Sequence, residues 1–268
     1  MLCTAFGLYF RTECALPGGM PAREGVTPDV EIVFGVPRPW AETVAWGPYR
    51  VRDADLFEFV MPDVARYTIV DRNRVIITPV DGADVAPIGE MLVATVLPSL
   101  LWARGEVVLH ASAIARQDRD VGLLFMGASG SGKSTRLQRA VGRGARAIAD
   151  DSVRLHIRDG AVIASGLPGG FFARPHDMTD RRTLIPVPLN QQLEEFPVRT
   201  VLMLEMDAKA ARRLTGLEAL AGLLRHRHRP RILKLLGTEA NFIGTIGEIA
   251  TRLRAVTVGA RKDSLCAY

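Results

Sequence analysis

The sequence has few cysteines, few lysines and no long uncharged apolar run. Its three cysteines, Cys3, Cys14 and Cys266, are scattered and show no C-x-x-C spacing, which argues against a disulfide framework and against a zinc site. No stretch approaches 18 uncharged apolar residues, so we expect no membrane span. The N-terminal residues lack a basic leader with an apolar core, so we expect no signal peptide. These absences together predict a cytoplasmic protein with reduced thiols.

Positive charge is carried mainly by arginine and is spread along the chain. The net charge is +5, and lysine occurs only at positions 133, 209, 234 and 262. This excess suits an anionic nucleotide or an acidic peptide, but it is too small and too dispersed to predict nucleic-acid binding. The chain of 268 residues, 48% hydrophobic and 24% charged, suits one large globular domain or two small ones.

The chain divides into two predicted parts. Residues 1–87 predict a β-rich module, because runs rich in β-branched and aromatic residues, such as 30–34 and 56–60, alternate with Pro and Gly clusters. Residues 88–268 predict an α/β domain that begins with a mostly buried helix over 88–103, kinked or broken by Pro98. A strand over residues 107–115 follows this helix.

The strongest motif is the glycine loop, our name for residues 127–135. It matches G-x-x-x-x-G-K-[ST] at every fixed position, between an apolar strand expected over 121–126 and a helix expected over 134–142. Glycines let the backbone approach a polyphosphate, and N–H groups of such a turn converge on the anion. Lys133 can reach the β- and γ-phosphates, and the Ser134 hydroxyl can bind Mg²⁺. The predicted nucleotide-binding residues are Gly127, Ala128, Ser129, Gly130, Ser131, Gly132, Lys133, Ser134 and Thr135.

Two consecutive acids, Asp150 and Asp151, follow the apolar run 146–149 and lie within 20 residues of Lys133. P-loop folds place a magnesium-binding carboxylate at the end of a neighbouring parallel strand. We therefore predict that Asp150 and Ser134 bind a metal together. A simple turn after the strand is the alternative for such an acid pair.

A basic tract, Arg-His-Arg-His-Arg-Pro-Arg at residues 225–231, ends a helix predicted over 214–224. The favoured interpretation is a solvated helix C-terminus whose cations complement the helix dipole. Docking of an anionic substrate is the second interpretation.

Three segments in this order resemble the catalytic domain of HPr kinase/phosphorylase: Leu-His-Ala-Ser-Ala at residues 109–113, the glycine loop, and Arg-Gly-Ala-Arg-Ala-Ile-Ala-Asp-Asp at residues 143–151. The chain is more similar still to HPr-kinase-like proteins found beside ribosomal-peptide genes, including those for lasso peptides. The similarity is strong over about residues 105–155 and weaker elsewhere. It implies an α/β fold with a P-loop core of the HPr kinase C-terminal type and a smaller β-rich N-terminal module.

The resemblance also implies a serine kinase that uses ATP and Mg²⁺. By position, Asp150 matches the general base, Asp151 its neighbour that helps hold metal or partner charges, and His110 the histidine near the phosphates. A structural histidine at a strand end is the alternative for His110. Lys133 and Ser134 match the phosphate- and metal-binding pair. The favoured acceptor is a serine of a small peptide or protein, such as a lasso precursor peptide, and a homo-oligomer is expected by analogy with relatives.

One stretch departs from the family pattern. HPr enzymes carry E-I-R-G-L-G after the hairpin, whereas residues 165–170 here are Ser-Gly-Leu-Pro-Gly-Gly and contain no acid. This argues against the phosphorylase reaction and against HPr as the substrate. Arg174, His176 and Asp177 lie just beyond and are candidates to replace the missing acid. The alternatives are an HPr (Ser) kinase in carbon regulation, a small-molecule kinase or NTPase, and a nucleotide-binding regulatory protein that transfers no phosphate.

Overall fold

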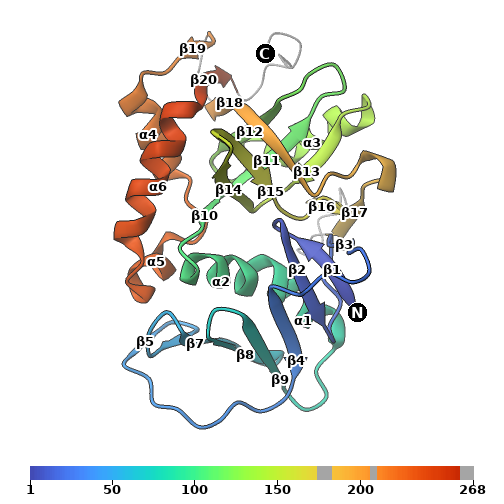
Figure 1. The fold of residues 1–268 in the computed structure, drawn as a ribbon, viewed down its shortest axis with the longest axis vertical. Helices are drawn as coiled ribbons and strands as arrows, with labels where there is room; N and C mark the ends of the chain where they lie inside the picture. The colour runs from blue at the N-terminus through green and yellow to red at the C-terminus, as the bar shows by residue number, and fades with distance from the viewer. Residues whose placement is uncertain (174–182, 206–209, 260–268) are drawn as a thin grey trace. The chain divides into compact units, whose positions relative to one another are not determined.

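The structure, a computed structural model, describes residues 1–173, 183–205 and 210–259 and is mixed α/β (Figure 1). It contains two compact units. The first consists of Met1–Glu106 and Arg229–Phe242, and the second of Val107–His228 and the chain from Ile243 onward. The predicted boundary at residue 87 differs from this division, because the helical segment that follows it belongs to the first unit and the chain returns to that unit at Arg229.

The first unit contains a nine-stranded mixed sheet, in agreement with the predicted β-rich module. Its strands are β1 (Leu2–Ala5), β2 (Leu8–Thr12), β3 (Met20–Pro21), β4 (Val30–Phe34), β5 (Val44–Trp46), β6 (Tyr49–Val51), β7 (Leu56–Met61), β8 (Ala65–Val70) and β9 (Arg74–Pro79). The strand order is β3-β1-β2-β4-β9-β8-β7-β6-β5. The β2–β4 and β4–β9 pairs are parallel, and all other neighbours in this order are antiparallel.

The helical segment of the first unit is continuous across Pro98. It consists of α1 (Val85–Met91), a π-helical turn η1 (Leu92–Val96) and α2 (Leu97–Ala103), with Pro98 in the first turn of α2. Pro98 has no N–H to donate to the carbonyl of Ala94, four residues earlier. The Nε of Arg229, which immediately precedes α5 (Pro230–Leu236), donates to that carbonyl at 3.1 Å instead.

This segment also bears on the expectation of no membrane span. Among the described residues, Val85–Ala103 is the one helical stretch long and apolar enough to cross a membrane by length and composition alone. Because 67% of its apolar window is buried within the protein, it has the character of a core helix.

The second unit contains a curled mixed sheet (Figure 1). Its strands are β10 (Val107–Leu109), β11 (Ala111–Ala115), β12 (Gly122–Gly127), β13 (Arg146–Ala149), β14 (Val153–Arg158), β15 (Ala161–Ser165), β18 (Glu195–Glu205), β19 (Arg212–Arg213) and β20 (Arg254–Gly259). The main order is β10-β14-β15-β18-β12-β11-β13, with β20 paired to β18 and to β19. Strands β12, β18 and β20 are parallel to one another. A separate hairpin pairs β16 (Gly170–Ala173) with β17 (Thr183–Pro186).

The remaining helices are α3 (Lys133–Gly142), the 3₁₀ turn η2 (Leu189–Gln191), α4 (Gly216–Arg225) and α6 (Glu239–Arg252), the last containing residues of both units. Helix α3 buries Leu137, Ala140 and Val141 in a cluster with Phe125 of β12. Its apolar positions recur at helical spacing, which explains why this segment folds as a helix against the sheet.

The strand predicted over residues 107–115 is divided at His110. β10 pairs with β14, whereas β11 pairs with β12 and β13. Between them, the backbone N–H of His110 donates to the carbonyl of His226 at 2.7 Å. The chain therefore changes strand partners at the histidine.

Gly166, directly after β15, allows close packing against the end of β13. A Cβ on Gly166 would overlap the Cβ of Ala149 and lie 2.9 Å from the carbonyl oxygen of Ser152. We expect Gly166→Ala to lower the free energy of unfolding by about 1–3 kcal/mol, the usual cost of overpacking. The matched control is Gly142→Ala at the end of α3, where a Cβ would meet nothing within 4 Å. Urea denaturation measures both, and equal midpoints for the two variants would contradict the packing argument.

Candidate active site

The glycine loop connects β12 to α3, so the predicted strand and helix on either side of it are confirmed. Gly130 and Gly132 have φ of +80° and +89°, a region that residues with a Cβ rarely adopt. At Gly127 a Cβ would lie 2.5 Å from Ser131 Oγ and 2.9 Å from the carbonyl oxygen of Leu204. The two fixed glycines of the motif, Gly127 and Gly132, and Gly130 between them are therefore each favoured by the backbone.

Polar groups of the loop are directed inward. Lys133 Nζ donates to the carbonyl oxygens of Gly127 and Ala128 at 2.9 and 3.1 Å. Ser131 Oγ is buried and has no hydrogen-bond partner among the described residues. A bound phosphate accepts hydrogen bonds, so it would satisfy both this hydroxyl and the Lys133 ammonium group.

A cavity of about 740 Å³ adjoins the glycine loop. It is lined by loop residues 128–131, by residues 203–205 at the end of β18, and by Gly222, Arg225 and His226 of α4 and its C-terminus. Its volume lies within the range typical of small-molecule sites, about 300–1,000 Å³. It is large enough for the base and ribose of a nucleotide whose phosphates lie in the loop.

Asp150 is a buried carboxylate next to the loop, 7% exposed. The hydroxyls of Ser112 and Ser134 donate to its Oδ1 at 2.5 and 3.1 Å. Burial raises the pKa of Asp150 above its ordinary value, and these two hydrogen bonds oppose that rise. The structure thus brings together the predicted metal-binding pair, Ser134 and Asp150, and adds Ser112, to which the sequence analysis gave no role.

The position of Asp150 in the sheet differs from the prediction. It follows β13, but β13 does not neighbour β12; β11 lies between them and is antiparallel to both. The run 146–149 is equally apolar in either arrangement, so the sequence did not reveal the inserted strand. Ser112 on β11 reaches Asp150 because of this insertion.

The backbone turns sharply at the two acids. Ser152 N–H donates to the carbonyl of Asp150 at 2.8 Å, and Asp151 between them has a φ of +67°. This conformation costs of order 1–3 kcal/mol for a residue with a Cβ, and such strain is common at functional sites. The sequence left two interpretations of Asp150 and Asp151, a simple turn and a functional acid pair. The two residues do form a turn, and this does not argue against a functional role.

His110 contacts Asp151. Its Nδ1 lies 3.0 Å from the backbone carbonyl oxygen of Asp151 and 3.5 Å from Oδ1 of the carboxylate. Burial lowers the pKa of His110 below its ordinary value, and the Lys133 ammonium lowers it further. The carboxylate and carbonyl of Asp151 oppose this decrease in the pKa of His110.

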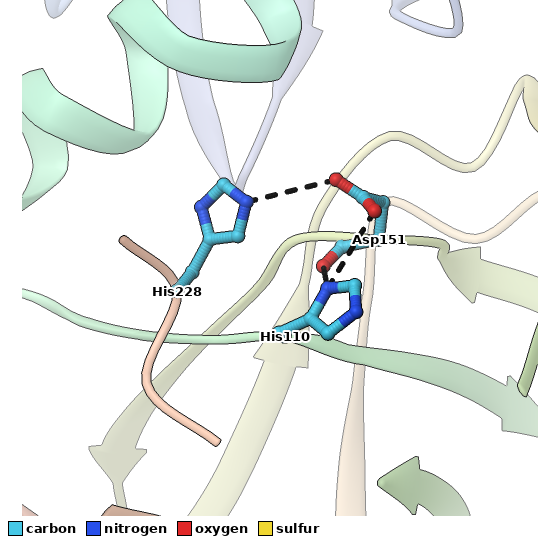
Figure 2. A group of neighbouring side chains, drawn as sticks. All are labelled: His110, Asp151 and His228. Carbon is cyan, nitrogen blue, oxygen red and sulfur yellow. Dashed lines mark hydrogen bonds and ion pairs between the residues drawn. The ribbon is translucent and has the colours of Figure 1, made fainter. Parts of the chain in front are cut away.

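His228 is a second site residue, after Ser112, that the sequence did not reveal. It is 6% exposed, so the favoured interpretation of the basic tract as a solvated helix end is wrong for this residue. Its backbone N–H donates to the carbonyl of Val108 at 3.0 Å, and its Nε2 lies 3.6 Å from Oδ2 of Asp151 (Figure 2). The only sequence signal was the alternation of Arg and His over 225–228, which has the period of a strand.

Ser134 and Asp150 fit Mg²⁺ in chemistry and in spacing. Mg²⁺ prefers oxygen ligands at 2.0–2.1 Å in an octahedron, in which neighbouring ligands are about 2.9 Å apart. Ser134 Oγ and Asp150 Oδ1 are 3.1 Å apart. The candidates Arg174, His176 and Asp177 lie outside the described residues, and no acid occurs at residues 165–170.

His226 gives the site a measurable pH dependence. Burial, with the charges of Lys133 and His110, lowers the pKa of His226 from 6.5 to about 4. Between these two values the unfolded chain binds a proton that the folded chain does not, so the free energy of unfolding falls as pH falls through this window. We expect His226→Gln to lose less stability than the wild type between about pH 7 and about pH 4.5 in urea denaturation. Identical pH dependence in the two proteins would exclude a lowered pKa of the half-buried His226 imidazole.

No family model and no curated protein matches the chain. Among solved structures, it is similar to the HPr(Ser) kinase/phosphatase from Coxiella burnetii, with 19% sequence identity and a TM-score of 0.33. The match covers 50% of this chain and 94% of that chain. At this identity and TM-score, the likeness decides neither the fold nor the reaction of this protein.

Proposed function

We propose that this protein is an ATP-dependent kinase that transfers the γ-phosphoryl group to a serine hydroxyl of a small peptide or protein. The observation that carries the proposal is the contact between the buried Asp150 carboxylate and Ser134 of the glycine loop, at 3.1 Å. It places a potential proton acceptor beside residues that match a nucleotide-binding motif. The resemblance to HPr kinases, stated from the sequence, supports the same roles for these residues.

In this proposal the nucleoside occupies the cavity beside the loop, and the phosphates lie along the loop. Lys133, which now donates to Gly127 and Ala128, turns to the β- and γ-phosphate oxygens. Mg²⁺ held by Ser134 and Asp150 would neutralise charge on the phosphates. The left-handed glycines allow the loop backbone to approach the phosphates closely.

The acceptor serine oxygen attacks the γ-phosphorus while the bond to the β–γ bridging oxygen breaks, and ADP leaves. The proton of the serine hydroxyl passes to Asp150, whose pKa is raised by burial towards a range better suited to a general base. Ser112 and Ser134 hold the carboxylate in place through their hydrogen bonds. Positioning and electrostatic stabilisation supply most of the catalysis in phosphoryl transfer, so few further groups are required.

The proposed class of acceptor rests on the resemblance to HPr-kinase-like proteins and on the one stretch that departs from the HPr enzyme pattern. The HPr-kinase-like proteins that this chain resembles are encoded beside lasso-peptide genes. By this resemblance the acceptor is a precursor peptide. The enzyme is then a homo-oligomer in the cytoplasm. The stretch 165–170 contains no acid, which disfavours the phosphorylase reaction and HPr. A nucleotide-binding regulatory protein is the second candidate, because the cavity and the loop would serve it equally well.

Lys133→Ala tests the nucleotide site. We expect phosphoryl transfer to fall at least about 100-fold, since one preorganised charge typically contributes about 3 kcal/mol to transition-state stabilisation. Lys234→Ala, an exposed lysine of α5, is the matched control and should retain wild-type activity. The measurement is ADP release and phosphopeptide formation with Mg-ATP. A folded Lys133→Ala protein with a rate within about threefold of the wild type would remove this residue from the mechanism.

Asp150→Asn tests the general base and separates a kinase from a binder. The amide keeps the shape but loses basicity and charge, so we expect transfer at saturating Mg-ATP to fall by about 100-fold or more. Because Asp150 also holds Mg²⁺ in this proposal, ATP binding should need more Mg²⁺, and a magnesium titration separates this effect from the loss of the base. Asp159→Asn in the hairpin turn after β14 is the control, since it removes an exposed acid elsewhere. The assay is intact-mass spectrometry of serine-containing peptides, and of HPr, for an acid-stable phosphoester.

The outcomes distinguish the candidates. Wild-type rates in Asp150→Asn would disprove the base assignment. Phosphate on HPr with all peptides unmodified would favour the carbon-regulation alternative. Tight ATP binding with no transfer to any acceptor would favour the regulatory protein.

A further inference from the structure

Three side chains from distant segments meet beside the acid pair. We call His110, Asp151 and His228 the His–Asp–His cluster (Figure 2). His110 lies between β10 and β11, Asp151 follows β13, and His228 follows α4. Each offers one nitrogen or oxygen atom, and these three atoms all lie within 4.8 Å of one another.

The cluster is held by the backbone on every side. Arg227 and Leu109 form an antiparallel bridge, flanked by hydrogen bonds from His110 N–H to His226 and from His228 N–H to Val108. This bridge fixes the spacing of the two histidines, whose ring centroids are 6.1 Å apart. The strained turn at Asp151, with φ of +67°, places the carboxylate beside both rings (Figure 2). The ligand atoms are therefore positioned before any ion binds.

The separations between the side chains suit a shared ion better than imidazole–carboxylate hydrogen bonds. His110 Nδ1 also lies 3.0 Å from the backbone carbonyl oxygen of Asp151, so an ion bound at Nδ1 would replace the proton of that contact. A charge-assisted hydrogen bond between imidazole and carboxylate would measure about 2.7–2.9 Å. The separations here are 3.5 Å for His110 Nδ1 to Asp151 Oδ1 and 3.6 Å for His228 Nε2 to Asp151 Oδ2. Two ligands bound to one tetrahedral metal at 2.0–2.1 Å lie about 3.3 Å apart.

We propose that the His–Asp–His cluster binds one divalent transition-metal ion, of the Zn²⁺ or Mn²⁺ type. Two imidazoles and one carboxylate select such ions, whereas Mg²⁺ and Ca²⁺ prefer oxygen ligands alone. Three protein ligands leave at least one position for water or another oxygen ligand. This site is separate from the Ser134–Asp150 pair, whose donors are oxygens only. The sequence argued against a zinc site only through the spacing of its cysteines, and this cluster uses none of them.

The test uses tag-free full-length protein without nucleotide, with Co²⁺ as the probe. The visible absorption of bound Co²⁺ reports nitrogen ligation and a low coordination number. We expect one equivalent to bind with a Kd of about 10 μM or tighter. His228→Gln and Asp151→Asn should each weaken binding at least about 100-fold, beyond the 10- to 100-fold typical of residues that only orient a ligand. Competition with Zn²⁺ and Mn²⁺ in calorimetry ranks the ions.

Two controls make the result specific. His156→Gln removes a histidine of β14 outside the cluster, and Ser134→Ala removes the proposed Mg²⁺ ligand; neither should change Co²⁺ affinity by more than about threefold. Loss of binding in Ser134→Ala would place Co²⁺ at the other pair and overturn the proposal. Unchanged binding in folded His228→Gln and Asp151→Asn, or no binding to the wild type at about 1 mM Co²⁺, would overturn it as well. Because ATP is absent, failure of the kinase proposal leaves this test unaffected.

Discussion

A carboxylate enclosed in the second unit constrains the elements around it. Removing a charged group from water costs several kcal/mol unless hydrogen bonds or a counter-ion offset the loss. Asp150 receives hydrogen bonds from Ser112 on β11 and Ser134 at the start of α3. The ends of two strands and the first turn of a helix are therefore held together by one charge. Burial of the Asp150 carboxylate costs free energy. Burial also raises the pKa of this carboxyl group, so the carboxylate is a stronger base.

Part of the site could be predicted from the sequence because local order specifies it. The glycine loop, Lys133 and Ser134 follow from residue types at fixed spacing, and Asp150 from its place after an apolar run. His228 could not be predicted, because it lies 76 residues from Ser152, which it contacts. It reaches the site through backbone pairing with β10. No local pattern reports which distant segment will pair with a strand.

The fold shows the same limit. Strands of the first unit such as β4 and β7 were evident from their β-branched and aromatic composition, and the helix over 88–103 from its apolar length. Its continuity across Pro98 was not evident, because the sequence predicted a kink or break there. The division of residues 107–115 was not evident, because β10 and β11 are both fully buried and only His110 and Ser112 interrupt the apolar residues of this stretch. Periodicity reports burial; it does not report a change of partner at His110. For the same reason the insertion of β11 between β12 and β13 left no trace in the residue types.

The first unit is discontinuous, and this affects its synthesis. Its two segments, Met1–Glu106 and Arg229–Phe242, are separated by the 122 residues of Val107–His228. The later segment supplies the donor to the Ala94 carbonyl and the Arg231 guanidinium that lies 5.0 Å from the Trp46 ring on the edge strand β5. At about 5–20 residues per second, the ribosome needs about 6–24 s to make the intervening residues. During that time the first unit cannot be completed, and the Trp46 ring on β5 lacks its contact with Arg231.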